Sequence, residues 1–303
     1  MADFSSKVRW RMRYDRSQHL VTMQDKFLLR EYAEKRAVGM APLLFVGERA
    51  EEIPFKELPD HCMIKASHGC GWNIVRRNRE YYYFGDGSNF ECIDFRDKRG
   101  HGLKGAKRLD EGEVLRLCSG WLQKKYSTDE WAYHQMRPRV LIEELLFPHS
   151  GKELLDYRFY TFDGEVAVIN VGSPGYRTEK LNVFFLPDWT LVPLGCNAEA
   201  LPKPLPPRPE SLQAMIDAAR RLGKDIDFAR IDFYETKKGF FLGEMTAYPE
   251  GGKRLSPTSC SCFNIWLGKQ WRLKPARELH VWICNIGFLV GRRLRRVLRA
   301  LEC

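Results

Sequence analysis

A pair of apolar segments joined by a short turn constrains this chain most strongly. Residues 229–234 (ARIDFY) and 241–246 (FLGEMT) both have the length and composition of short buried strands. Residues 236–239 (TKKG) lie between them and supply a turn, so the pattern predicts an antiparallel hairpin. Charged residues interrupt both apolar strands, and their positions indicate which ligand the hairpin would bind.

The charged residues of the hairpin fall on shared faces, because residues i and i+2 of a strand point the same way. A five-residue loop, 236–240, places Asp232 opposite Glu244 and Arg230 opposite Thr246, whereas a four-residue loop breaks this register. Two directly opposed carboxylates repel each other, and a divalent cation between them removes the conflict. Mg²⁺ favours one or two carboxylates together with substrate phosphates. We therefore interpret the hairpin as half of a nucleotide–metal site, the alternative being an exposed hairpin with scattered charges.

A glycine turn far upstream predicts the other half of such a site. Residues 62–65 form a short apolar strand that ends in Lys65, residues 68–73 (HGCGWN) follow, and residues 74–77 return as a second strand. Glycines allow backbone N–H groups to approach an anion closely, and Lys65 adds a point charge for a phosphate oxygen. The turn matches neither a P-loop nor a dinucleotide-binding turn. It suits a flap that closes over phosphates, although plain hairpins also contain such turns.

Residues 139–146 (RVLIEELL) form a third element, a buried strand interrupted by two acids. Adjacent strand residues face opposite ways, so one of Glu143 and Glu144 points inward. A buried acid needs a partner. The sequence leaves four partners open for this acid: the exocyclic amine of a base, a lysine, a ribose hydroxyl, or a structural salt bridge.

Together these elements occur in the order of the ATP-grasp fold. The chain resembles the teichuronopeptide-biosynthesis, TupA-like branch of that superfamily over roughly residues 10–265. The segments that carry the resemblance are 14–16, 25–32, 58–60, 65–74, 138–144, 156–159 and 162–165, in addition to the hairpin. Their joint occurrence is specific, whereas each segment alone is not.

The resemblance implies nucleotide-binding roles for residues of all three elements. They are Lys65, His68, Gly69, Gly71, Asn73, Glu143, Glu144, Leu145, Leu146, Asp156 and Arg158. Lys65 is expected on the α and β phosphates, the two glycines in a mobile phosphate loop, and residues 143–146 at the adenine edge. For His68, phosphate contact and a structural hydrogen bond in the turn both stay open. Glu153 and Asp156 are the candidates for binding the ribose.

The resemblance also implies a metal site and two catalytic residues. Asp232 and Glu244 are expected to hold Mg²⁺, while Arg230 and Lys65 are the expected catalytic residues, with Arg230 stabilising the charged phosphoryl intermediate. Thr246 stands where many ATP-grasp enzymes carry a metal-binding Asn. A hydroxyl is a weaker ligand than an amide carbonyl, so one or two metal ions remain open.

The fold class that follows is α+β: an ATP-grasp fold in which two α+β lobes clamp ATP. Residues 1–60 are expected to be a helical lead-in with a helix over 18–35, and residues 61–146 the nucleotide-clamping lobe, with a helix near 111–126. Residues 147–265 are expected to be the metal-binding sheet lobe, in which a helix starts at Pro209 and stops at Gly223. Residues 266–303 are expected to be a basic amphipathic helical extension.

The composition and net charge of the chain limit the binding partners and the location that are expected for it. The chain has 303 residues, a net charge of +10 and a pI of about 9.1, which favours anionic partners. Residues 279–290 are apolar but too short to span a bilayer, so the C-terminal helix is expected either on an anionic membrane surface or against the domain or a homodimer partner. Residues 1–16 do not resemble a signal peptide, and the nine cysteines indicate free thiols. The expected location is cytoplasmic, either free or peripheral at the inner membrane face.

The expected function is that of an ATP-dependent carboxylate–amine ligase that forms an amide through an acyl phosphate and releases ADP. The family suggests an amino acid joined to a cell-surface glycan, such as a uronic-acid polymer, or to a peptide. An ATP-grasp kinase that phosphorylates a sugar or another hydroxyl is the alternative. A nucleic-acid or membrane-binding protein is a third interpretation, but it leaves Lys65, Asp232 and Glu244 without a role.

Overall fold

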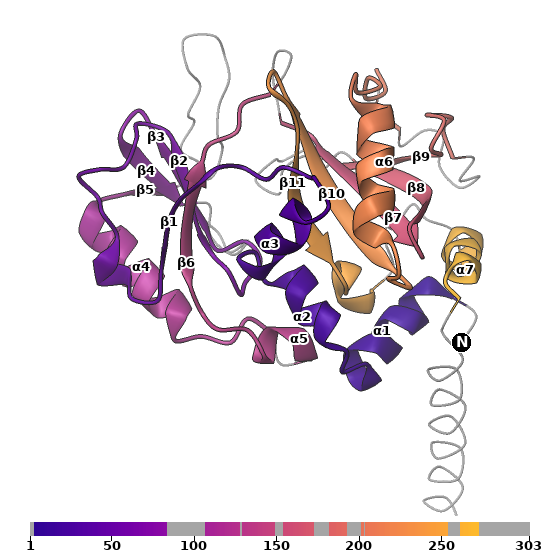
Figure 1. Cartoon of the computed structure of the whole chain (residues 1–303), viewed down its shortest axis with the longest axis horizontal. Helices are drawn as coiled ribbons and strands as arrows, with labels where there is room; N and C mark the ends of the chain where they lie inside the picture. The colour runs from indigo at the N-terminus through magenta and orange to yellow at the C-terminus, as the bar shows by residue number, and fades with distance from the viewer. Residues whose placement is uncertain are drawn as a thin grey trace, which may run out of the picture.

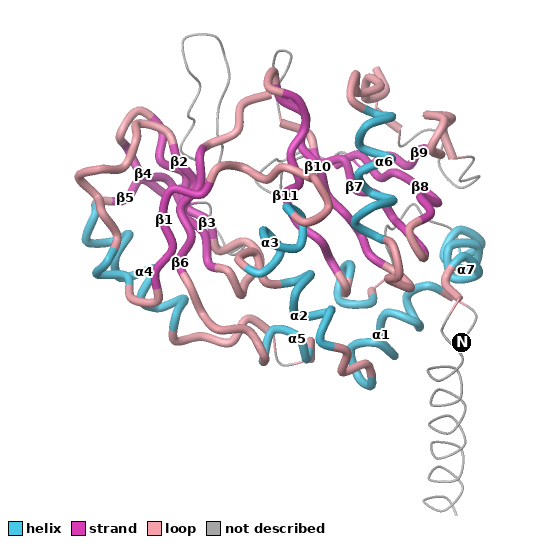
Figure 2. Tube along the Cα trace, viewed as in Figure 1, coloured by secondary structure: helices cyan, strands magenta, loops and turns pink. Residues whose placement is uncertain are grey.

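Two antiparallel sheets lie side by side in a computed structural model of the chain (Figure 1). The structure describes residues 3–83, 107–127, 129–148, 154–172, 182–192, 201–202, 204–253 and 261–272. Helices flank each sheet and lie along the junction between them (Figure 2). No helix among these residues is long and apolar enough to cross a membrane. Of the expected extension over residues 266–303, the part from residue 273 on lies outside the described residues, as does the ribose candidate Glu153.

The smaller lobe is built on a six-stranded sheet with the strand order β1-β6-β2-β3-β4-β5. Its strands are β1 Leu43–Gly47, β2 Cys62–Ala66, β3 Asn73–Arg77, β4 Glu80–Tyr83, β5 Lys107–Leu109 and β6 Val140–Glu144. Helix α4, Glu111–Leu122, packs on this lobe through Val114, Cys118 and Trp121. It begins at Asp110 because the side chains of Asp110 and Glu113 satisfy each other's backbone N–H groups in a capping box. A short 3-10 turn, Ala50–Glu52, follows β1.

The larger lobe is built on a five-stranded sheet with the order β11-β10-β7-β8-β9. Its strands are β7 Asp156–Phe162, β8 Glu165–Gly172, β9 Asn182–Phe185, β10 Ala229–Thr236 and β11 Gly239–Thr246. Helix α6, Leu212–Gly223, contacts β7, β8 and β10. Its buried stripe contains Leu212, Met215, Ile216, Ala219 and Leu222, and it ends at the predicted Gly223. The predicted start at Pro209 is wrong, because the helix begins at Leu212. The turn Pro249–Gly252 and helix α7, Ser261–Gln270, follow β11.

The N-terminal region is divided between the two lobes. Helices α1 (Phe4–Tyr14), α2 (Gln18–Gln24) and α3 (Leu28–Glu34) contribute to the core of the larger lobe, whereas β1 joins the smaller sheet. The prediction of one helix over 18–35 is wrong, because the chain breaks at residues 25–27. The buried Asp25 side chain accepts hydrogen bonds from the backbone N of Phe27 (2.8 Å) and of Leu28 (3.4 Å), so a side chain replaces helical backbone bonding here.

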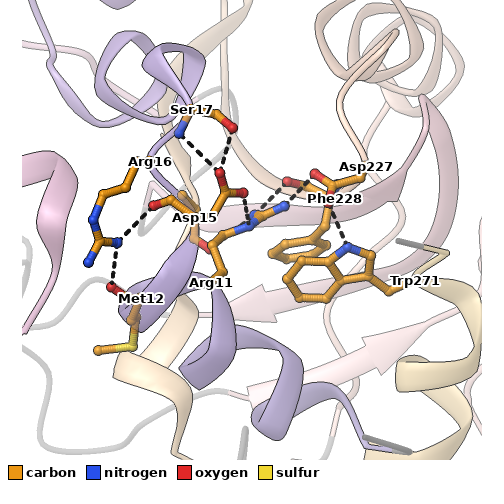
Figure 3. A network of polar contacts seen from close by, with 9 residues as sticks. Arg11, Met12, Asp15, Arg16, Ser17, Asp227, Phe228 and Trp271 are labelled. Carbon is orange, nitrogen blue, oxygen red and sulfur yellow. Dashed lines mark hydrogen bonds and ion pairs between the residues drawn. The ribbon is translucent and has the colours of Figure 1, made fainter. Parts of the chain in front are cut away.

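The buried Arg11 of α1 and Trp271, the residue after α7, both bond to residues that directly precede β10 of the larger sheet (Figure 3). Arg11 donates to the Asp227 carboxylate (2.5 Å) and to the Phe228 carbonyl oxygen (2.9 Å). The Trp271 indole N–H donates to the other Asp227 oxygen (3.0 Å), and the Arg11 guanidinium lies 4.3 Å from the centre of a Trp271 ring. Both charges of the pair are buried and compensated, so truncating either residue would leave an uncompensated charge.

Candidate active site

The hairpin of β10 and β11 has the register that the sequence predicts: Asp232 lies opposite Glu244, and Arg230 lies opposite Thr246. The predicted five-residue loop is wrong, however. Thr236 pairs with Gly239, so only two residues form the turn, and a bulge beyond Asp232 restores the register by inserting Gly243. A Cβ on Gly243 would overlap the Tyr234 ring, so the bulge requires glycine at this position.

Arg230 lies between the two opposed acids. Its guanidinium donates to both oxygens of Asp232 (2.9 and 2.6 Å) and to one oxygen of Glu244 (2.8 Å). Burial and the nearby Glu244 carboxylate raise the pKa of Asp232 to about 7, although Arg230 opposes the shift. Burial also disfavours ionisation of Glu244, but Arg230 and Lys26 outweigh it and lower the pKa of that carboxyl to about 2. One guanidinium compensates only one of two carboxylates, so the cluster is negatively charged above about pH 7, where both acids are ionised, and close to neutral below it.

Asp232 and Glu244 are the residues of this cluster that could hold a divalent cation together with substrate phosphates. The Glu244 side chain keeps 34% of its surface exposed, while Asp232 is almost fully buried. The Thr246 hydroxyl donates to the Glu244 oxygen that already accepts from Arg230 (3.2 Å). Among the described residues no group of three or more His, Cys, Asp or Glu side chains forms a metal cluster. Two carboxylates are the kind of ligand that a hard cation such as Mg²⁺ takes together with a nucleotide's phosphates, and in this structure both pair with Arg230 instead.

A second arginine continues the polar row across the larger sheet. Arg158 on β7 lies opposite Asp232 and donates to Asp156 (2.8 Å) and to Asn170 (3.3 Å). Burial disfavours its charge, but the carboxylates of Asp156 and Asp232 outweigh this and raise the pKa of Arg158. A Cβ on Gly172 would lie 2.7 Å from the guanidinium carbon, so the glycine makes room for Arg158. The structure thus places both predicted β7 residues, Asp156 and Arg158, beside the hairpin of β10 and β11.

In the smaller lobe, Glu143 is the inward acid of β6. Its carboxylate forms ion pairs with Lys65 on β2 and with Arg30 on α3, the latter at 2.5 Å, and its side chain is 4% exposed. Burial opposes its ionisation, but the two cations outweigh burial and lower the pKa of Glu143. Glu144 is more exposed and lies 3.8 Å from Lys238. Of the partners left open by the sequence, the structure therefore supplies a lysine, with an arginine in addition.

The predicted adenine-edge residues continue from β6 into the connection between the lobes. Leu145 and Leu146 are half-buried and follow the end of the strand. Pro148 then forms an isolated bridge with Thr236, the residue at which the hairpin turns. This connection therefore runs beside the hairpin of β10 and β11.

The glycine loop joins β2 to β3, as the sequence predicts. Gly71 has a φ of +73°, which favours glycine, and a Cβ on Gly69 would overlap the Trp72 ring. Asn73 pairs with Lys65 where the two strands meet. The His68 ring is buried, and its Nε2 lies 2.9 Å from the Trp121 carbonyl oxygen. Burial lowers the pKa of His68, so the ring is neutral and anchors the loop to α4.

Lys26 is a site residue that the sequence interpretation did not single out. Its ammonium donates to the Gly69 carbonyl, and its backbone N donates to the Ser67 carbonyl (3.2 Å). The same charge helps to lower the pKa of Glu244. Lys26 therefore lies near both the glycine loop and the hairpin of β10 and β11. The signal was present, because Lys26 and Arg30 both belong to segment 25–32, which carries part of the family resemblance.

Comparison with known proteins assigns the family. The family model described as TupA-like ATPgrasp matches residues 6–271, and the chain belongs to this family. Its ATP-grasp α+β fold is therefore confirmed. A search of curated proteins finds no match.

Solved structures with a similar fold are distant in sequence. D-alanine–D-alanine ligase from Bacillus anthracis complexed with ATP has 13% identity and a TM-score of 0.43, covering 83% of this chain and 65% of that one. N5-carboxyaminoimidazole synthetase from Staphylococcus aureus has 10% identity and a TM-score of 0.45, covering 84% and 53%. L-amino acid ligase from Bacillus licheniformis has 11% identity and a TM-score of 0.45, covering 84% and 52%. This chain thus spans less than two thirds of each of the three.

Proposed function

We propose that this protein is an ATP- and Mg²⁺-dependent carboxylate–amine ligase that joins an amino acid to an acidic glycan or peptide. The observation that carries the proposal is a pair of charged clusters, one with two acids and one cation and the other with two cations and one acid. Arg230 lies between Asp232 and Glu244 on the hairpin, while Glu143 lies between Lys65 and Arg30 in the other lobe. Such a pair suits a cation on one side and polyphosphate on the other.

Residues of the smaller lobe bind the nucleotide in this proposal. Lys65 and Lys26 contact phosphate oxygens, and the backbone of the glycine loop approaches them. The buried ion pair with Glu143 restricts the conformations of the Lys65 side chain and orients it toward the site. Leu145 and Leu146 flank the base in the connection between the lobes, and Asp156 is the remaining ribose candidate.

Residues of the larger lobe stabilise the transferring phosphoryl group. Asp232 and Glu244 would hold Mg²⁺, which when bound offsets phosphate charge. Arg230 and Arg158 present two guanidinium groups on the same sheet face, where charge develops as phosphate moves from ATP to the acceptor carboxylate. The closed glycine loop excludes water, which would otherwise hydrolyse the acyl phosphate. An amine then attacks the carbonyl carbon, the bond to the phosphate oxygen breaks, and inorganic phosphate leaves.

The net charge of +10 supports an acidic acceptor such as a uronic-acid polymer. A mass-spectrometric screen of uronic acids, short acidic peptides and amino acids with Mg-ATP tests the proposal. An ATP-dependent condensation product with one ADP per amide is expected. Phosphorylated alcohols without condensation would favour the kinase alternative instead. Salt-sensitive binding to anionic polymers without ATP turnover would contradict both enzymatic interpretations.

A further inference from the structure

A row of polar side chains crosses the larger sheet and extends beyond the hairpin of β10 and β11. Arg158 on β7 lies opposite Asp232 of the hairpin on one side and opposite Asn170 of β8 on the other. Asn182, the first residue of β9, continues the row, because Nδ2 of Asn170 donates to its side-chain oxygen (2.6 Å). Since β7, β8 and β9 are neighbours in the sheet, the row leads from the acids of the hairpin through Arg158 to two amides.

Three hydrogen bonds fix the orientation of the Asn170 amide, which belongs to a residue that is only 2% exposed. Its Nδ2 donates to the side chain of Asn182 and to the carbonyl oxygen of Val183 (3.3 Å), both on β9. Its Oδ1 accepts from Nη1 of Arg158 (3.3 Å). The acceptors on β9 take both amide hydrogens, so the carbonyl oxygen of the amide must face Arg158. A buried amide is costly unless it is bonded, and here both polar atoms of the side chain have partners.

Three residues hold the guanidinium of Arg158 in place. Asn170 accepts from Nη1, and Asp156 accepts from Nη2 (2.8 Å). Gly172 leaves the space that the group fills, because a Cβ there would lie 2.7 Å from the guanidinium carbon. The Arg158 side chain keeps 22% of its surface exposed, and its Nε–H has no hydrogen-bond partner among the described residues. The guanidinium is therefore fixed while it retains donors for a ligand.

Asn170 differs from the other acceptor, Asp156, because it carries no charge. The charges of Asp156 and Arg158 already balance, so a second carboxylate at position 170 would make this part of the row negative and repel a phosphoryl group. An apolar side chain of similar size would leave Nη1 of Arg158 without this partner. An amide at position 170 thus holds the guanidinium without weakening its attraction for an anion.

We infer that Asn170 is a positioning residue for phosphoryl transfer: together with Asn182, it fixes the guanidinium of Arg158 beside Asp232, where the phosphoryl group passes from ATP to its acceptor. Because Asn170 is buried, it acts through Arg158 rather than by touching a substrate. A displaced guanidinium keeps its charge, but a displacement of about 1 Å in such a site can cost about 100-fold in rate. The inference rests on the proposed function, because only phosphoryl transfer needs an arginine held at this place.

Calorimetry of Mg-ADP binding to the full-length protein, with and without aluminium fluoride, tests the inference. Aluminium fluoride beside ADP mimics the transferring phosphoryl group, so we expect it to tighten ADP binding in wild type. In Asn170→Ala this tightening should be about tenfold smaller, with unchanged affinity for Mg-ADP alone. Gly172→Ala should behave alike, because its Cβ displaces the guanidinium and leaves Asn170 intact. Ile169→Val is the matched control, since it removes one buried methyl group from the opposite face of β8.

A double-mutant cycle separates positioning from a general loss of structure. Arg158→Lys keeps the charge but not the planar fork that Asn170 holds, so part of the tightening should remain. Adding Asn170→Ala to Arg158→Lys should then change the tightening by less than about twofold, although urea denaturation still records the lost hydrogen bonds. If Asn170→Ala alone does not fold, Gly172→Ala and Asn182→Ala decide, because the latter removes one of the acceptors that orient the amide.

The outcomes separate the inference from the function on which it rests. Full tightening in Asn170→Ala, or independent losses that add in the double variant, would overturn the inference and leave the proposed function intact. Wild type that binds Mg-ADP without any tightening by aluminium fluoride would overturn it as well. Wild type that binds neither Mg-ADP nor Mg-ATP would overturn the proposed function itself.

Discussion

The two lobes carry charge clusters of opposite balance. In the smaller lobe, one acid, Glu143, is shared by two cations, Lys65 and Arg30. In the larger lobe, one cation, Arg230, is shared by two acids, Asp232 and Glu244. With all groups ionised, the first cluster carries one unit of excess positive charge and the second one unit of excess negative charge; because the pKa of Asp232 is about 7, the negative excess is complete only above that pH.

The difference shows how a fold keeps charges buried while remaining receptive to a charged ligand. A fully compensated cluster has little affinity for an ion, and an uncompensated one costs folding stability. An imbalance of at most one unit lies between these limits. In the proposed function, the positive cluster meets phosphates and the negative cluster meets the metal ion that accompanies them.

The largest effect is expected from removing the shared cation of the negative cluster. Arg230→Met leaves two acids opposed without a cation, so we expect a loss of about 3–5 kcal/mol in the free energy of unfolding and no ligase turnover. Urea denaturation and ADP release measure the two effects. Arg49→Met is the control, because Arg49 is exposed and pairs only at the surface. A variant as stable as wild type would show that Arg230 does not hold the acids together.

Removing one acid of the negative cluster should affect chemistry more than stability. In Asp232→Asn or Glu244→Gln, Arg230 still pairs with the remaining acid, so the protein should stay folded. Loss of a metal ligand should reduce turnover at least about 100-fold and abolish the Mg²⁺ dependence of nucleotide binding in calorimetry. Near-normal activity in both variants would reject the metal assignment, and Glu57→Gln, at an exposed acid, should behave as wild type.

The positive cluster should reveal itself through the pH dependence of stability. The pKa of Glu143 lies below its ordinary value of 4.5 in the folded protein, so its ion pairs stabilise the fold above that value and are lost as the pH falls through the lower, folded pKa. Glu143→Gln should therefore be less stable than wild type at about pH 7, and the gap should narrow at about pH 3. Urea midpoints at both pH values measure this. A gap that does not change with pH would mean that Glu143 contributes packing rather than charge.

The smallest effect is expected at the edge of the negative cluster. Thr246→Asn introduces an amide carbonyl, a better ligand for a hard cation than a hydroxyl. We expect Mg²⁺ to bind a few-fold more tightly in the presence of nucleotide, with unchanged nucleotide affinity in its absence. Calorimetric titration with Mg²⁺ decides, and Thr246→Val should shift the affinity the other way. Equal affinity in all three proteins would place Thr246 outside the metal site.

The sequence alone determined which side chains each strand or turn contributes to the two clusters. The alternation of strand residues put Arg230 and Asp232 on one face, and it required one of Glu143 and Glu144 to face inward. It also predicted that a glycine loop follows Lys65. These properties depend only on near neighbours in the chain, which is why the pattern of residue types is enough to predict them.

Only the tertiary structure decided which charges meet and in what register. One of the two cations that pair with Glu143 is Arg30, which is 113 residues away in sequence. Lys26 reaches the glycine loop because Asp25 breaks the expected helix. The correct hairpin register arises from a shorter turn and a bulge at Gly243 that cancel each other in length. Long-range pairing depends on how lobes, helices and bulges pack together, and the packing free energy is a property of the whole fold rather than of any segment.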